Sequence, residues 1–146
     1  QYAPFVMGVI EEFGAKNISD YGAGKRRLKS KLKELGLRKF GYYPYDPAFP
    51  EYGEPKEAVL VCCIDVLEHV EPLYIDAVLI DLKKITIEHG FFTIHTGPAR
   101  KTLPDGRNAH LIQKPASWWL PKLCDHFEVI HLQQSADGFW IVVSRR

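Results

Sequence analysis

The sequence predicts an α/β fold: a three-layer sandwich around a mostly parallel sheet with one antiparallel strand. Apolar segments of strand length, such as the Val-rich Ala58–Ile64, alternate along the chain with amphipathic segments of helical period. A continuous apolar run is typical of a strand covered on both faces, and strands that alternate with helices form parallel sheets. The last two strand-like segments, Phe127–Leu132 and Phe139–Val143, flank Ser135–Gly138 and predict a closing hairpin.

The elements of the first half follow from periodicity and from glycine and proline positions. Leu28, Leu32 and Leu35 recur at helical spacing before Gly36, which predicts an amphipathic helix that ends there. The expected elements are a helix over Pro4–Gly14, a strand over Asn17–Tyr21, a helix over Lys25–Leu35, a strand over Phe40–Tyr45, and a loop over Asp46–Pro55.

The second half is expected to repeat the alternation of helix and strand before the hairpin. Its segments are a helix over Leu73–Ile85, a turn at Glu88–Gly90, a buried strand over Phe91–His95, a polar loop over Thr96–Pro115, and a helix over Pro115–Cys124. The polar loop is too long to serve only as a connection in a compact domain, which favours a functional role for it.

Composition excludes several classes of protein. The 146 residues suit a single domain spanning 1–146, and 46% of them are hydrophobic, enough for a real core. Apolar runs are far shorter than the ~20 residues of a membrane helix. The net charge of +1 argues against a protein that coats nucleic acid. Adjacent Cys62 and Cys63 and the single Cys124 form no disulfide framework and predict reduced thiols in a cytoplasmic protein.

Open parallel sheets bind ligands at the carboxyl ends of their strands. That rule selects the segments Asp20–Lys25, Asp46, Asp65–His69 and His95–His110. The first contains Gly22-Ala23-Gly24 between a strand and a helix, where glycines let a ligand approach the backbone and the helix start offers free N–H groups. Asp46 ends the next strand, where a carboxylate can accept both hydroxyls of a ribose. This arrangement predicts a cofactor that contains a nucleoside.

Several of these segments resemble motifs of the class I S-adenosylmethionine-dependent methyltransferases. Asp65–Val70 reads DVLEHV, like the family's fourth-strand motif, and Ser19–Gly24 looks like its first motif. Leu82–Phe92 looks like the family's turn into its fifth strand, and Phe127–Ile130 resembles its penultimate strand. The resemblance spans roughly Asn17–Val143 and implies a Rossmann-like methyltransferase fold, an enzyme and S-adenosyl-L-methionine as cofactor.

The resemblance also implies which residues bind the cofactor. The residues around its methionine part would be Asp20 and Gly22–Gly24, Asp46 would hold the ribose, and Ile64–Leu67 would line the pocket floor near the sulfonium. The full expected set is Asp20, Tyr21, Gly22, Ala23, Gly24, Asp46, Pro47, Ile64, Asp65, Val66 and Leu67.

The sequence departs from the family pattern in two places. Arg26 stands where the first motif has its third glycine. Only the eleven residues Pro47–Glu57, with three prolines and a glycine, separate Asp46 from the next strand. They cannot hold the helix, strand and helix of a full family member. We therefore expect the third strand to be missing and the adenine side to be open or to have a different wall.

Methyl transfer needs a base only when the nucleophile carries a proton, and histidine titrates near neutral pH. The candidates are His69, His95 and His110, with a base expected at His95 or His110. No tight metal-ligand spacing such as HxH is present, so no metal is expected. The polar loop and the helix after it suit a polar, anionic acceptor, and the expected substrate-binding residues are Arg100, Arg107, Asn108 and Trp118.

The resulting hypothesis is methyl transfer from S-adenosylmethionine to an oxygen or nitrogen of a small polar molecule, for which the cationic loop favours a negative group. The alternative is a non-catalytic domain of the same fold that binds the cofactor or serves in assembly. A nucleic-acid methyltransferase is disfavoured, because Asp65–Glu68 lacks the Asn/Asp-Pro-Pro-aromatic motif of that class. The expected protein is a monomer or homodimer with a small-molecule substrate and no membrane partner.

Overall fold

The centre of the fold is a six-stranded sheet with the order β2-β1-β3-β4-β6-β5. It is seen in a computed structural model that describes residues 1–146. The strands are β1 (Asn17–Tyr21), β2 (Gly41–Tyr45), β3 (Ala58–Ile64), β4 (Thr86–His95), β5 (Phe127–Gln134) and β6 (Gly138–Arg145). The helices are α1 (Ala3–Phe13), α2 (Arg27–Glu34), α3 (Ile75–Ile85) and α4 (Ala116–Cys124), with short 3-10 turns η1 (Pro50–Tyr52), η2 (Leu67–His69) and η3 (Pro72–Tyr74).

Strand directions confirm a mostly parallel sheet with one antiparallel strand. The pairs β1–β2, β1–β3 and β3–β4 are parallel, whereas β6 is antiparallel to both β4 and β5. The sheet ends at β2, because the chain between β2 and β3 contains only η1. The expected absence of a further strand in this segment is therefore confirmed.

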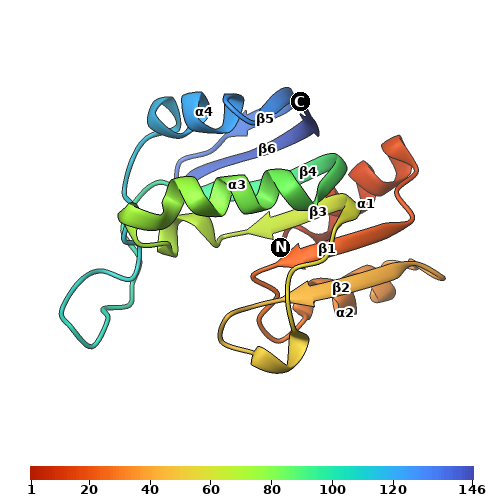
Figure 1. Cartoon of the computed structure of the whole chain (residues 1–146), viewed down its shortest axis with the longest axis horizontal. Helices are drawn as coiled ribbons and strands as arrows, with labels where there is room; N and C mark the ends of the chain where they lie inside the picture. The colour runs from red at the N-terminus through yellow and green to blue at the C-terminus, as the bar shows by residue number, and fades with distance from the viewer.

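Helices cover both faces of the sheet, as the sequence predicts (Figure 1). On one face, residues of α1 and α2 such as Val6 and Leu32 pack in a core with Cys62 and Phe91. On the other face, α3 and α4 bury residues such as Leu79 against a core that includes Cys63. The two adjacent cysteines thus point into different cores, as expected for successive residues of a strand. No helix is long and apolar enough to cross a membrane.

The turn expected at Glu88–Gly90 is wrong, because β4 begins directly after α3 and runs through these residues. Gly90 is paired with Val61 of β3 and with Val143 of β6. A Cβ at Gly90 would lie 2.7 Å from the ring of Phe92. The glycine therefore serves close packing within the strand and not a change of chain direction.

Helix α2 begins at Arg27, two residues later than expected. Arg26 has φ 60°, in the left-handed region that L-residues other than glycine rarely adopt. Arg26, which stands where the resembled motif has its third glycine, thus adopts a left-handed conformation. This backbone lets the glycine loop turn back before the helix starts.

Candidate functional site

The glycine loop after β1 is held at the carboxyl edge of the sheet by its neighbours. Backbone N–H groups of Gly22 and Ala23 donate to the carbonyl of Tyr45 at 2.7 and 2.9 Å. Gly22 has φ 86°, and a Cβ there would lie 2.3 Å from Cγ2 of Val66. Glycine is therefore required here for both its backbone conformation and its closeness to the segment that follows β3.

Asp46 closes the glycine loop at the end of β2. Its Oδ2 accepts a hydrogen bond from the backbone N–H of Gly24 at 2.9 Å, and its Oδ1 accepts one from Ala48 at 2.9 Å. A carboxylate offers roughly four lone-pair positions, so both oxygens keep capacity for further donors. The residue expected to hold a ribose is thus also the one that shapes the loop.

A pocket of about 480 Å³ lies beside the glycine loop. Its lining residues are Asp20, Gly22, Ala23, Gly24, Lys25, Arg27, Leu28, Phe49 and Ile64. Asp20 is 4% exposed and accepts a hydrogen bond from the hydroxyl of Tyr42. Burial raises the pKa of Asp20 from 3.8 to about 6, while the Tyr42 hydrogen bond opposes the shift. The pocket therefore holds a buried acid, two cationic side chains and an apolar wall.

The segment between β2 and β3 supplies the aromatic part of that wall. The rings of Phe49 and Tyr52 are stacked with centroids 5.2 Å apart. The Tyr52 hydroxyl donates to the carbonyl of Gly24 at 2.7 Å, and the guanidinium of Arg26 lies 5.6 Å from the Tyr52 ring. These contacts bind the short segment to the glycine loop and position Phe49 at the pocket.

The DVLEHV segment leaves β3 through a strained residue. Asp65 has φ 54° and is held by Thr93 of β4, whose hydroxyl donates to Asp65 Oδ1 at 2.7 Å and accepts from the Asp65 N–H at 2.9 Å. Glu68 then lies fully buried; its Oε2 accepts only the His95 N–H, at 3.3 Å, and its Oε1 has no partner. Burial raises the pKa of Glu68 to about 7.

The three candidate histidines come together beside Glu68. Ring centroids of His69 and His110 are 4.7 Å apart, and those of His95 and His110 are 4.8 Å apart. His69 Nδ1 lies 2.9 Å from the carbonyl of Ala109, and His110 Nδ1 lies 2.7 Å from the carbonyl of Gly97. Because a carbonyl only accepts, Nδ1 carries the proton in both rings, and each neutral ring has a free lone pair on Nε2.

His95 has the opposite arrangement. Its Nδ1 accepts a hydrogen bond from the Gly97 N–H at 3.2 Å, so its Nε2 carries the proton. His95 can therefore donate a hydrogen bond, whereas His69 and His110 can accept a proton. Partial burial of the His69 ring lowers its pKa, which favours its neutral form.

A second cavity, of about 630 Å³, is lined by His95, His110 and Arg100, together with other loop residues and Asp137. Asn108 shapes this loop: its Oδ1 accepts from the N–H groups of Ala99 and His110, both at 2.9 Å. Of the four residues expected to bind substrate, the structure brings only Arg100 to this cavity.

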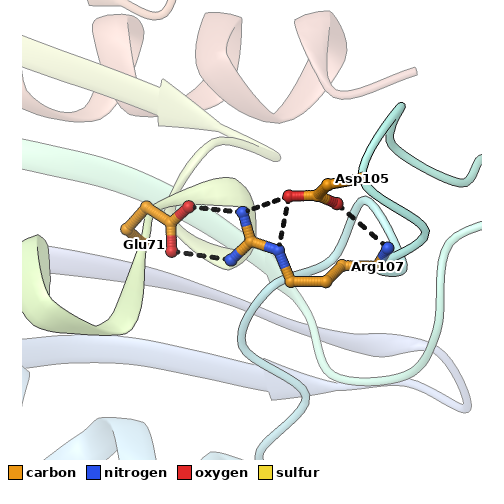
Figure 2. A network of polar contacts seen from close by, with 3 residues as sticks. All are labelled: Glu71, Asp105 and Arg107. Carbon is orange, nitrogen blue, oxygen red and sulfur yellow. Dashed lines mark hydrogen bonds and ion pairs between the residues drawn. The ribbon is translucent and has the colours of Figure 1, made fainter.

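Arg107 and Trp118 are engaged elsewhere. Figure 2 shows the Arg107 guanidinium between two carboxylates. It forms a bidentate ion pair with Glu71, with N–O distances of 2.7 and 2.9 Å, and an ion pair with Asp105 at 2.8 Å. Trp118 packs edge to face on Trp119 at 5.0 Å. Arg107 therefore clips the loop to the segment after η2 and is not free to hold an anion in the cavity.

Comparisons with solved structures identify the fold. A Pyrococcus horikoshii OT3 protein matches 99% of this chain and 88% of its own, with a TM-score of 0.69 and 11% identity. The magnesium protoporphyrin IX methyltransferase of Synechocystis PCC 6803, solved with bound S-adenosylhomocysteine, matches all of this chain and 83% of its own, with a TM-score of 0.64 and 14% identity.

The chain has the class I methyltransferase fold. A third structure, the 1,6-didemethyltoxoflavin-N1-methyltransferase of Burkholderia thailandensis with bound 1,6-didemethyltoxoflavin and S-adenosylhomocysteine, agrees, with a TM-score of 0.64 and 16% identity over 97% of this chain and 76% of its own. No family model and no curated protein matches the sequence.

Within this methyltransferase fold, the predicted cofactor residues have different surroundings. Asp20, Gly22, Ala23, Gly24 and Ile64 line the glycine-loop pocket. The other predicted residues do not line this pocket. Tyr21 and Leu67 are core residues, Val66 packs on Gly22, and Pro47 is exposed. Asp46 holds the glycine loop, and Asp65 lines a smaller cavity with His95.

Sequence reasoning missed three features of the pocket and its neighbourhood. Phe49 lies in the expected loop Asp46–Pro55 and Arg27 in the expected helix Lys25–Leu35, and neither was expected at the pocket; Glu68 lies in the selected segment Asp65–His69 but was given no role of its own. Only the last had a usable signal, since an acid beside a histidine directly after a buried strand is a chemical pairing. The wall role of Phe49 depends on how η1 folds back, which no local pattern encodes.

Proposed function

We propose that this chain binds S-adenosylmethionine in the glycine-loop pocket and transfers its methyl group to an oxygen or nitrogen of a small polar, anionic molecule. The observation that carries the proposal is the pocket of about 480 Å³ at the carboxyl edge of the sheet, which combines buried Asp20, the glycine loop and Phe49. Two structures of the same fold contain S-adenosylhomocysteine in their own sites, which supports this choice of cofactor.

The chemistry of the lining residues fits the parts of that cofactor. A buried carboxylate, Asp20, suits an ammonium group, and the cationic side chains of Lys25 and Arg27 suit a carboxylate. A Cβ at Gly24 would meet nothing within 4 Å, so the loop leaves open space for a ligand there. Asp46 retains acceptor capacity for ribose hydroxyls, and the Phe49 ring offers an apolar face for adenine.

S-adenosylmethionine supplies a methyl group already activated on a sulfonium, so the protein's task is mainly alignment. The glycine-loop pocket and a smaller cavity adjoin at the end of β3. Ile64 lines the glycine-loop pocket, and the next residue, Asp65, lines the smaller cavity together with His95. His95 also lines the larger cavity with Arg100. The acceptor would therefore bind along the same sheet edge, next to the histidines.

The histidines divide into one donor and two proton acceptors. His95 would orient the acceptor through its Nε2–H, and Arg100 would bind its negative group. When no metal ion is bound to these rings, the free Nε2 of His69 or His110 would take the proton from a hydroxyl oxygen or an ammonium nitrogen, and that atom would then attack the methyl group. The reduced thiols Cys62, Cys63 and Cys124 support a cytoplasmic location.

Titration calorimetry with S-adenosylhomocysteine, using chelator-treated protein, tests cofactor binding. We expect saturable binding that Asp20→Asn weakens at least ~10-fold, about 1.4 kcal/mol, whereas exposed Asp125→Asn leaves it unchanged. Absence of heat at millimolar ligand would overturn the proposal. Turnover of labelled S-adenosylmethionine with phosphorylated and carboxylated acceptors then tests catalysis; tight binding without turnover would favour the non-catalytic alternative.

A further inference from the structure

A compact set of metal-ligating atoms lies beside the proposed acceptor cavity. One carboxylate oxygen of Glu68 and one ring nitrogen each of His69 and His110 all lie within 4.8 Å of one another. Glu68 and His69 come from η2, directly after β3, and His110 comes from the long loop after β4. Segments about forty residues apart in the chain thus meet at one point.

Both imidazole rings make the second hydrogen bond that is typical of metal ligands. A ligating histidine usually donates its second ring N–H to a carbonyl or carboxylate, which fixes the ring and leaves the other nitrogen for the ion. His69 and His110 each direct Nδ1 to a backbone carbonyl, of Ala109 and Gly97, at 2.9 and 2.7 Å. The free Nε2 lone pairs are then available to a cation without any change of tautomer.

Glu68 provides an independent indication that a cation binds here. Its side chain is fully buried, Oε1 has no hydrogen-bond partner, and no lysine or arginine forms an ion pair with it. Buried carboxylates are normally paired with a cation or hydrogen-bonded on both oxygens. Coordination of a metal ion by this carboxylate would compensate its buried charge.

We propose that Glu68, His69 and His110 bind a divalent first-row transition metal ion, such as Zn²⁺ or Mn²⁺. Two imidazoles and one carboxylate suit such ions, and three protein ligands leave at least one coordination position open. His110 also lines the cavity that contains His95 and Arg100, so the open position is expected to take water or an oxygen of a bound acceptor.

The fold holds the ligands in place before any ion arrives. The Ile112 N–H donates to the carbonyl of Glu68 at 3.0 Å, which joins the end of the loop to η2. The pair between Arg107 and Glu71 makes a second junction between the same segments (Figure 2). A bound ion would occupy the two free nitrogens and would itself make a coordinated hydroxyl more acidic, in place of a histidine base.

Metal binding can be measured without any cofactor, so its failure is distinguishable from failure of the methyltransferase proposal. Chelator-stripped protein without a histidine tag is titrated with Co²⁺ and with Zn²⁺, followed by visible absorption and by competition with a chromogenic chelator. Because the exposed thiol of Cys124 could itself bind the metal, every protein used in these titrations also carries Cys124→Ser. We expect one ion per chain, visible Co²⁺ absorption bands from protein ligation, and a higher Tm with Zn²⁺.

The variants distinguish a built site from adventitious binding. Isosteric Glu68→Gln and His69→Ala, at an exposed residue, are each expected to weaken binding at least ~100-fold, while His131→Ala on β5 leaves it unchanged. The absence of stoichiometric binding, or equal affinity in His69→Ala and His131→Ala, would overturn the proposal. If Glu68→Gln fails to fold, the comparison of the two histidine variants still decides it.

Discussion

Replacement of Asp20 by asparagine is expected to stabilise the fold at neutral pH while it weakens cofactor binding. Asp20 is 4% exposed, and its pKa is raised from 3.8 to about 6, chiefly by burial. A group whose pKa is raised on folding stabilises the folded state below its unfolded pKa and loses this contribution as pH rises through the folded value. Ionised Asp20 therefore destabilises the folded state above about pH 6.

The shift from 3.8 to about 6 amounts to ~3 kcal/mol at 1.36 kcal/mol for each pKa unit. Asparagine resembles the protonated acid and can still accept the hydrogen bond from the Tyr42 hydroxyl. We expect Asp20→Asn to be ~2 kcal/mol more stable than wild type at pH 7.5 and nearly equal to it at pH 4.

Urea unfolding followed by tryptophan fluorescence, between pH 4 and pH 8, measures this difference. The two stability curves should separate between pH 4 and pH 6, while exposed Asp125→Asn should follow wild type throughout. Parallel curves, or a variant less stable than wild type at pH 7.5, would refute the view that a buried, unpaired charge is retained here for ligand binding.

Three further predictions concern the glycine loop and the aromatic wall. Gly22→Ala should destabilise by ~2–4 kcal/mol in urea unfolding, because its Cβ would collide with Val66 Cγ2; Gly24→Ala, with open space, should lose only ~1 kcal/mol, and equal losses would contradict the collision argument. Phe49→Ala should weaken S-adenosylhomocysteine binding by about 1 kcal/mol in calorimetry, whereas Phe5→Ala on α1 should leave binding unchanged. Equal losses of affinity in the two variants would show that Phe49 does not contact the ligand. Arg26→Gly should raise thermal stability by ~0.5–1 kcal/mol, because glycine adopts φ 60° without strain; a lower Tm would show that the contact between Arg26 and Tyr52 outweighs that strain.

Local patterns were sufficient to predict most of the fold. The bounds of β1 and β3 agree with prediction to the residue, because β3 is an apolar run between Glu57 and Asp65 and β1 ends where the glycine loop begins. The absence of a third strand of the family pattern was predictable from the length of one segment, since the residues between Asp46 and Ala58 are too few for more than a loop. Gly90 was misread because a glycine required by side-chain packing and one required by a turn look the same in a sequence.

The candidate site was only partly predictable. The sequence by itself determined which segments reach the carboxyl edge of the sheet, because strand direction and alternation decide that. The tertiary structure alone decided that Arg107 faces Glu71 and Asp105, that Phe49 folds onto the glycine loop, and that Glu68 and His110 meet. Those contacts join residues far apart in the chain through loops that have no periodicity, and hydrogen bonds of the folded backbone set the direction of each side chain.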